Sequence, residues 1–269
     1  MDAWFLEGSG LESATPSLLL LLVLTGLAAG FIDAVVGGGG LLQLPVALMI
    51  PGISPVQALA TNKMGSVFGT ATSAVTYYRR VHPDLRTALP MAVVALVASG
   101  GGAAVALLLP SEVFRPIIVA ALIGVLIFTI AHPTMGQLTA LRHTGARHYG
   151  LAVLLGGGIG FYDGVMGPGT GSFLVIGLVS VLGYSFLAAS AKAKINNLAT
   201  NIGALIVFTA NGSVLWGLGL VLGISNMLGG YIGARTAVAK GSSFIRLIFF
   251  VVVTVLIVKL GWDILNGRS

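Results

Sequence analysis

The sequence predicts an all-α polytopic membrane protein, and three observations lead to that fold class. Of the 269 residues, 56% are apolar and only 8% are charged, and the mean hydropathy is +1.01. Soluble domains carry about 25% charged residues, and a soluble globule of this length has no way to bury so much apolar side chain. The apolar runs are also long and continuous, which favours helices over the alternating strands of a barrel. Soluble enzyme classes are therefore excluded.

Eight apolar segments are long enough to cross a bilayer as helices, at about 20 residues per span. Two further apolar pieces, 41–50 and 171–183, are too short to span alone, and each follows a glycine-rich break. The first 15 residues hold three acidic residues and no basic one, so they lack the basic region of a secretory signal. We expect full helices at 17–36, 54–78, 87–109, 113–131, 148–166, 186–210, 213–237 and 243–264.

An internal repeat relates the two glycine breaks. Residues 30–37 match residues 160–167 at five of eight positions, with an offset of 130. After one inserted residue, Lys63 and Lys194 each begin a Lys-x2-polar-x3-polar pattern, whose side chains share one helix face. Duplication with a glycine break in each half is typical of secondary transporters. The predicted organisation is an N-terminal tail (1–15), a first half (16–131), a connecting loop (132–147) and a second half (148–266) within one membrane domain.

The loop charges favour inverted halves. If both short pieces cross the bilayer, each half has five crossings, and an N-terminus outside places eight bases inside and three outside. If the short pieces re-enter instead, the protein has eight spans and parallel halves, and the better orientation places seven of these bases inside and four outside. Because basic residues gather in cytoplasmic loops, the sequence favours the inverted arrangement. It leaves open whether the two short helices cross or re-enter.

Each glycine break precedes a short apolar helix, and a helix N-terminus presents free N–H groups that bind anions. Irregular backbone at membrane depth is tolerated only inside protein or beside water. Glycine lets a ligand approach the backbone closely, and tight helix packing is the alternative interpretation. Because the two breaks occupy repeat-related positions, we expect an anionic substrate to bind at Gly39, Gly40, Gly169, Thr170 and Gly171.

Lys63 and Lys194 lie eight or nine residues into their helices, about 13 Å along the helix axis. A lysine at that depth is costly and usually functional, so both are candidates for neutralising a substrate anion. Snorkelling to the membrane interface is the alternative. Neutral polar side chains beside the lysines either complete an oxyanion site or hold the helices together. They are Asn62, Ser66, Asn196, Asn197 and Asn201.

Asp33 and Asp163 are the acidic residues placed inside the predicted spans, at matching positions before the two glycine breaks. A buried carboxylate must be paired or protonated. Three roles stay open: pairing with a lysine, capping a helix end, and gating or proton coupling. An intramembrane protease is not favoured, because the histidines lie at loops and no Gly-x-Gly-Asp motif accompanies Tyr162 and Asp163. The sequence contains no cysteine, and we expect no metal or cofactor.

Two matching sets of motifs run through the chain. The first half contains Gly-Phe-Ile-Asp at 30–33, four glycines at 37–40 and Ala-Thr-Asn-Lys at 60–63. The second half contains Asp163, glycines at 167, 169 and 171, and Lys-Ile-Asn-Asn at 194–197. Over about residues 16–264, the sequence resembles the TauE/SafE family of sulfite and organosulfonate exporters. The resemblance implies a permease of the bacterial or archaeal cytoplasmic (inner) membrane that handles anions such as sulfite and sulfoacetate.

The sequence therefore leads to one hypothesis and two alternatives. The hypothesis is a secondary transporter, an exporter, that moves a small sulfur-containing anion by alternating access between the two halves. The alternatives are an anion channel on the same scaffold and a non-transporting membrane scaffold. Membrane lipids are expected partners and nucleic acid is not, because the net charge of +6 comes mainly from loop residues. The oligomeric state stays open, with a homodimer as one candidate.

Overall fold

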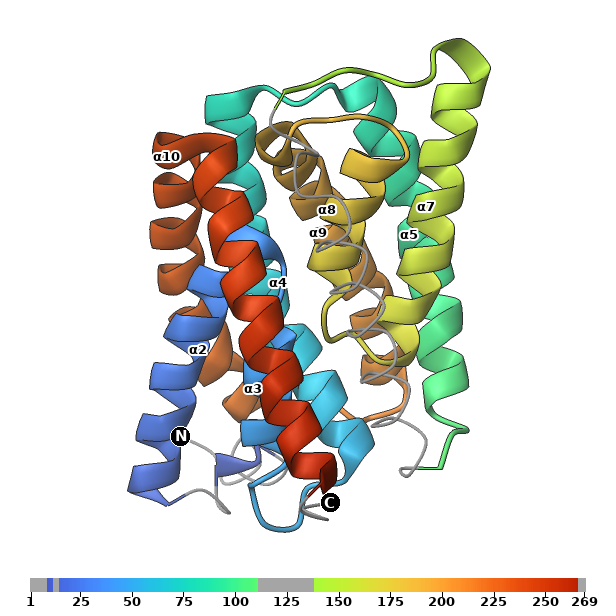
Figure 1. The fold of residues 1–269 in the computed structure, drawn as a ribbon. Coiled ribbons are helices and arrows are strands. Elements are labelled where there is room, and N and C mark those ends of the chain that lie inside the picture. Colours follow the sequence, from blue (N-terminus) through green and yellow to red (C-terminus); the bar gives the residue numbers. More distant parts are fainter. Residues whose placement is uncertain (1–8, 12–14, 111–137, 266–269) are drawn as a thin grey trace.

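A computed structural model describes residues 9–11, 15–110 and 138–265 (Figure 1). Within these ranges all regular structure is helical, which confirms the predicted all-α class. The helix expected at 113–131 lies outside the described residues. The described helices are α2 (Pro16–Val36), α3 (Gly40–Ala47), α4 (Pro55–Val81), α5 (Leu85–Ala106), α7 (Gly145–Val165), α8 (Thr170–Ser180), α9 (Phe186–Ala210) and α10 (Trp216–Leu265).

The short apolar pieces become the short helices α3 and α8, each directly after its glycine break. The helix expected at 213–237 begins at Trp216, because residues 211 to 215 form the turn that follows α9. α10 is interrupted at Gly241, whose φ of 74° and ψ of −167° are not helical. Two helices therefore meet at Gly241, in agreement with the expected pair of segments in this region.

Three helices are long and apolar enough to cross a membrane by length and composition: Pro16–Val36, Leu85–Ala106 and the Trp216–Ile248 part of α10. α4 and α9 are 27 and 25 residues long, but each buries a lysine together with amide and hydroxyl side chains. These polar groups lower the hydropathy of a helix even when they point away from lipid. The expectation of eight full spans therefore stays a prediction.

Serine caps begin both polar helices. Ser54 Oγ accepts the N–H of Gln57 at 3.2 Å, and the Gln57 side chain accepts the N–H of Ser54 at 3.0 Å, which closes a capping box at α4. Ser185 Oγ accepts the N–H of Ala188 at 3.3 Å at the start of α9. The matched helices α2/α7, α3/α8, α4/α9 and α5/α10 begin 129, 130, 131 and 131 residues apart.

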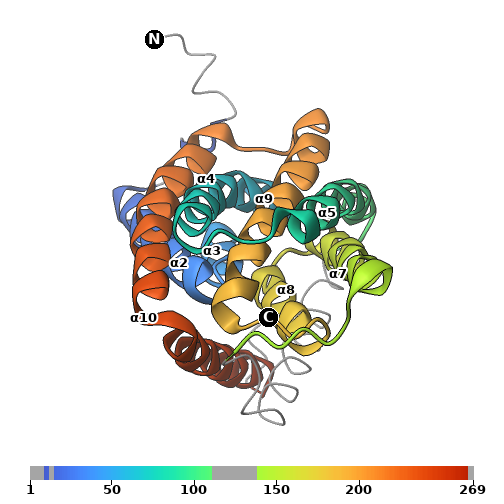
Figure 2. The same cartoon turned by 90° about the horizontal axis from the view of Figure 1, so that it is seen from above.

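The helices form two groups that do not coincide with the two sequence halves. α2 and α4 pack along α10, whereas α7 and α9 pack along α5. Viewed from above, α2, α3, α4 and α10 lie together, and α5, α7, α8 and α9 lie together (Figure 2). We call these sets the α10 group and the α5 group. Each group contains helices from both halves, and the two groups meet mainly where α4 packs against α9.

Close helix approach holds each group together. A Cβ atom on Gly30 of α2 would overlap the backbone of Asn226 in α10, and one on Gly164 of α7 would overlap the backbone of Ser99 in α5. Small residues at such crossings let helix backbones approach within van der Waals contact, which is the main source of helix association in a membrane. The first helix of each half therefore packs closely against the fourth helix of the other half, α2 against α10 and α7 against α5.

Candidate anion-binding site

The two glycine breaks meet at the centre of the molecule. Gly37 ends α2 in the left-handed conformation, with φ of 84°, and its N–H donates to Asp33 O at 2.8 Å. A Cβ atom on Gly37 would overlap the backbone of Gly171, and one on Gly171 would overlap Gly37. Ser172 fixes this contact, because its N–H donates to Gly37 O at 3.2 Å and its hydroxyl donates to Val36 O at 2.8 Å.

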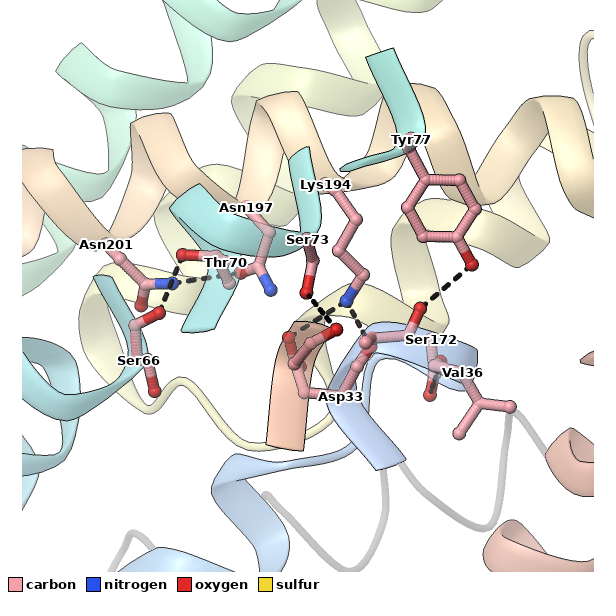
Figure 3. Close-up of polar contacts among 12 residues, drawn as sticks. Asp33, Val36, Ser66, Thr70, Ser73, Tyr77, Ser172, Lys194, Asn197 and Asn201 are labelled. Carbon is pink, nitrogen blue, oxygen red and sulfur yellow. Dashed lines mark hydrogen bonds and ion pairs between the residues drawn. The ribbon is translucent and has the colours of Figure 1, made fainter. Parts of the chain in front are cut away.

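Two buried ion pairs cross between the halves beside this contact. Lys63 Nζ lies 2.6 Å from Asp163 Oδ2, and Lys194 Nζ lies 2.9 Å from Asp33 Oδ2. Lys194 also donates to the backbone oxygen of Asp33 (Figure 3). The four side chains are between 1% and 12% exposed. Of the roles left open for the aspartates, lysine pairing is present in the structure, and it compensates the cost of burying each charge.

A small cavity of about 20 Å³ lies between the breaks and the ion pairs. That volume has room for about one water molecule. Each residue of its wall is either polar or a glycine. The wall consists of Asp33, Gly37, Gly40, Asn62, Lys63, Ser66, Asp163, Gly167, Gly169, Thr170, Gly171, Asn197 and Asn201.

Eleven of the fourteen expected site residues line the cavity, and three do not. Lys194 lies behind the wall and is bound to Asp33. Asn196 points elsewhere, because it follows Lys194 by two residues on α9 and donates to Lys192 O at 3.0 Å. Gly39 lies close against α2, where a Cβ atom on it would overlap the backbone oxygen of Ala29 and Cβ of Asp33. The structure therefore does not bring Lys194, Asn196 and Gly39 into the wall.

Polar partners hold most of the wall in place. Thr70, one turn beyond Ser66, donates to Ser66 O at 2.7 Å, and Thr170 donates to Gly167 O at 2.7 Å. Asn201 Nδ2 lies 3.4 Å from Asn197 Oδ1 (Figure 3). Asn62 Oδ1 is buried and has no hydrogen-bond partner within the described residues. A buried polar atom without a partner is costly, so Asn62 is the wall residue with the most to gain from a ligand.

Gly37 and Gly167 are cavity residues that the expected site did not include. They occupy matching repeat positions, and their φ angles are 84° and 85°. Lys63 Nζ would lie 3.0 Å from a Cβ atom on Gly167. The signal for them was present in the sequence, because both end the matched segments at an identical glycine.

A second polar cluster lies where α5, α7 and α9 begin, and sequence reasoning missed it. His148 is buried, and its Nε2 lies 3.0 Å from Tyr184 Oη and 3.2 Å from Thr87 Oγ1. Lys192 Nζ lies 4.3 Å from the centroid of the Tyr184 ring. Thr87 donates to Asp84 Oδ2 at 2.6 Å. This cluster ties three helices together at one end of the α5 group.

The electrostatic environment of this cluster shifts two pKa values. Burial alone would raise the pKa of Asp84, but hydrogen bonds from the Thr87 hydroxyl and the Arg86 N–H outweigh it and lower that pKa. Burial raises the pKa of the Tyr184 phenol. Asp84 therefore carries a charge at neutral pH, and Tyr184 stays protonated.

Comparisons with known proteins support a transport role. Residues 22–260 match the family described as "Sulfite exporter TauE/SafE". The chain is 38% identical over 243 residues to "Probable membrane transporter protein ORF9" of Sinorhizobium sp, a match that covers 90% of this chain and 92% of the relative. It is 35% identical over 257 residues to "Probable membrane transporter protein YfcA" of Escherichia coli strain K12, covering 95% and 94%. No solved structure matches the chain. The names of the relatives point to a transporter and not to an enzyme.

Proposed function

The chain belongs to the TauE/SafE family, and from that premise we propose that it is a secondary transporter that exports a small sulfur-containing anion, such as sulfite, sulfoacetate or another organosulfonate. It is a multi-pass membrane protein. The observation that carries the substrate class is the polar cavity between the two glycine breaks. Sulfur oxyanions present several acceptor oxygens, and the wall offers an ammonium group, amides, hydroxyls and glycine backbone to meet them.

The charge balance of the site supports a gating or proton-coupling role for Asp33 and Asp163. The two crossed pairs are neutral in sum, with two lysines against two carboxylates. An anion that binds Lys63 must displace Asp163, which leaves uncompensated negative charge in a buried site. Protonation of the displaced carboxylate removes that excess. In this proposal, the anion and a proton therefore enter and leave the cavity together, and net export follows an outward concentration gradient of the anion.

In the proposed alternating access, the bodies that move against each other are the α10 group and the α5 group. The sequence had suggested the two repeat halves for this role. The α10 group and the α5 group meet at the α4–α9 contact and at the Gly37–Gly171 contact. The ion pair of Lys63 with Asp163 joins α4 to α7, and that of Lys194 with Asp33 joins α9 to α2. Both pairs therefore bridge the groups. A rocking motion that opens the cavity to one side must rearrange them, which couples substrate binding to the motion.

Helix direction and loop charge support the inverted arrangement of the repeat. Figure 1 shows α2 and α7 running in opposite directions, and likewise α4 and α9. The ends at which α4 stops and α5 and α7 begin lie together, because Thr87 contacts His148 there. The loops 50–54 and 211–215, at the other ends of α4 and α9, contain no basic residue. We place the basic end in the cytoplasm of a bacterial or archaeal cell. Its residues are Arg79, Arg80, Arg86, Arg142, Arg147, Arg235, Lys240 and Arg246.

Counterflow in proteoliposomes tests the proposal. Purified protein would be reconstituted with internal sulfite, thiosulfate or sulfoacetate, and uptake of the labelled anion would be measured against chloride and phosphate. We expect saturable exchange with one of the sulfur anions. A conductance that does not saturate and shows no counterflow would instead indicate a channel. An absence of both exchange and conductance would overturn the proposal.

Lysine variants assign the exchange to the cavity. Lys63→Ala should abolish exchange, because Lys63 supplies the positive charge in the wall. Lys194→Ala should weaken it, because Asp33 then loses its partner. Lys192→Ala is the matched control, since Lys192 is also a buried lysine of α9 but contacts Tyr184 outside the cavity. Equal loss in the Lys192 and Lys63 variants would contradict the placement of the site.

A further inference from the structure

A groove on the outer surface of the α10 group carries a charge pattern that anion transport does not use. It runs between α4 and α10 and has a volume of about 460 Å³. Its walls include Ala71, Val75, Arg79, Arg80, Tyr231 and Arg235. Val75 is 49% exposed and Tyr231 is 46% exposed, so the groove is open at the surface, and it shares no lining residue with the buried cavity. The size is within the range of small-molecule sites.

Three guanidinium groups converge on this groove without a carboxylate partner. Among the described residues, Arg79, Arg80 and Arg235 form no ion pair. Arg235 Nη1 donates to Tyr231 Oη at 2.9 Å, and its guanidinium group lies 5.4 Å from the centroid of that ring. The Tyr231 hydroxyl thus orients Arg235 and leaves its positive charge available to a ligand.

The three arginines lie at one end of the groove. α4 and α10 run parallel with a constant register, because Gly65 approaches Leu222 and Ser73 donates to Gly230 O, 157 residues apart in each case. The same register places Arg235 beside the last turn of α4, which contains Arg79 and Arg80. One to two turns earlier along α4, the groove is lined by Ala71 and Val75 and by two threonines, Thr72 and Thr76, whose hydroxyls donate to backbone oxygens of the same helix. It is therefore cationic at the helix end and uncharged toward the middle of the helices.

The repeat supplies an internal comparison. With the offset of 131, Arg79 and Arg80 correspond to Ala210 and Asn211 at the end of α9, and Arg235 corresponds to Ala104 in α5. The matched position in the α5 group is therefore uncharged. The repeated fold does not require arginines here, so they serve something particular to the end of the molecule that carries the other basic loops.

We propose that this groove binds an anionic phospholipid, with the phosphate at Arg79, Arg80 and Arg235 and an acyl chain along Ala71 and Val75. Guanidinium groups bind phosphate through charge-assisted hydrogen bonds. Basic pockets between membrane helices on the cytoplasmic side suit anionic headgroups. The lipid would bridge α4 and α10, both in the α10 group, and would stiffen that group. The proposal does not depend on which anion the cavity transports.

Native mass spectrometry of the delipidated full-length protein tests this site. Dioleoyl phosphatidylglycerol and dioleoyl phosphatidylcholine would be titrated into detergent-solubilised protein. We expect at least one phosphatidylglycerol to bind about 100-fold more tightly than phosphatidylcholine, because each of the three arginines contributes about fivefold. The variant Arg79→Gln/Arg80→Gln/Arg235→Gln should lose this preference, at about fivefold for each arginine. Arg86→Gln/Arg142→Gln/Arg147→Gln is the matched control, because it removes three exposed arginines of the same end outside the groove.

Each result decides the proposal. Loss of the lipid preference in the groove variant alone supports the proposal. Equal loss in the control variant would show that the preference is a non-specific attraction of basic residues for the lipid, and it would overturn the proposal. Equal binding of the two lipids by the unaltered protein would also overturn it. Inorganic phosphate is added in a separate arm. Displacement of the lipid by low millimolar phosphate would assign the arginines to a soluble anion. If the triple variant does not fold, Arg235→Gln alone should still show a reduction of about fivefold.

Discussion

Lys63 and Asp163 form an ion pair of 2.6 Å across the two halves of the repeat, and their repeat partners Lys194 and Asp33 form the reciprocal pair at 2.9 Å. Each lysine is thus neutralised by the carboxylate of the other half. Buried charges lose most of their stabilisation when one partner is removed, because the remaining charge has neither water nor a counter-ion. The two pairs therefore make the proposed binding cavity a structural junction between the two halves as well.

Removing one member of the first pair should destabilise the protein more than removing both. Asp163→Leu leaves Lys63 buried without its counter-ion, which we expect to cost about 3 to 5 kcal/mol. Lys63→Met/Asp163→Leu should recover most of that loss, since it leaves no unpaired charge. Thermal unfolding in detergent compares the two variants. A double variant as unstable as the single one would mean that the pair is not the source of the effect.

Proton coupling predicts a specific phenotype for the aspartates. Asp163→Asn keeps the shape of the side chain but cannot take up a proton. It should abolish accumulation driven by a pH gradient, while counterflow between equal pH values persists at a reduced rate. The measurement compares uptake of the labelled anion into the same proteoliposomes with and without a pH gradient. Continued gradient-driven accumulation in both Asp163→Asn and Asp33→Asn would exclude these carboxylates as the proton carriers.

Because the two glycine breaks are in contact, adding a single methyl group at Gly37 should lower the stability of the protein strongly. Gly37→Ala adds a Cβ atom that overlaps the backbone of Gly171, and it also strains a left-handed residue with φ of 84°. Gly52→Ala is the matched control, because its φ is 78° and a Cβ atom there meets nothing within 4 Å. Gly52→Ala should cost about 1 kcal/mol from strain alone, and Gly37→Ala should cost clearly more. Similar melting temperatures for the two variants would argue against a tight contact.

Asp84 predicts a loss of stability in acid. Its folded-state pKa is lowered, so its contribution is present above the ordinary aspartate pKa of about 3.9 and disappears as pH falls through the folded value. Asp84→Asn retains the acceptor for the Arg86 N–H but removes the charge. The unaltered protein should melt higher than Asp84→Asn at pH 7, and the difference should shrink below about pH 4. A difference that does not change with pH would place the effect outside the ionisation of Asp84.

The sequence predicted the helices and the repeat because both depend on local patterns. Ser54, Pro55 and Gln57 define the start of α4 within a few residues of one another. The same local information located most of the cavity wall, since the glycine breaks and the Lys-x2-polar-x3-polar face lie within single segments. Asn196 lies outside the wall and donates to Lys192 O, because a cluster of amides in the sequence does not distinguish the faces of α9.

Long-range packing explains what sequence reasoning did not provide. Lys63 pairs with a residue 100 positions away and Lys194 with one 161 positions away, and no local pattern selects those partners. His148 looks like an interfacial residue near a loop, yet Thr87 and Tyr184 from two other segments enclose it. The sequence also did not predict that the α10 and α5 groups each contain helices from both halves. That arrangement depends on which helices approach closely at their glycines, such as α2 with α10 and α7 with α5.

The exchange of helices between the groups has a consequence for biogenesis. α2 begins at Pro16 and packs along α10, which begins at Trp216, so the ribosome adds about 200 residues before α2 meets its neighbour. Until then the face of α2 that contains Gly26 and Gly30 has no α10 to pack against. A nascent chain that stops after its first half has no α10 for α2 and no α7 for α5. Such a fragment leaves the small-residue faces of α2 and α5 without their packing partners, so we expect that half of the chain not to form a stable helix group by itself.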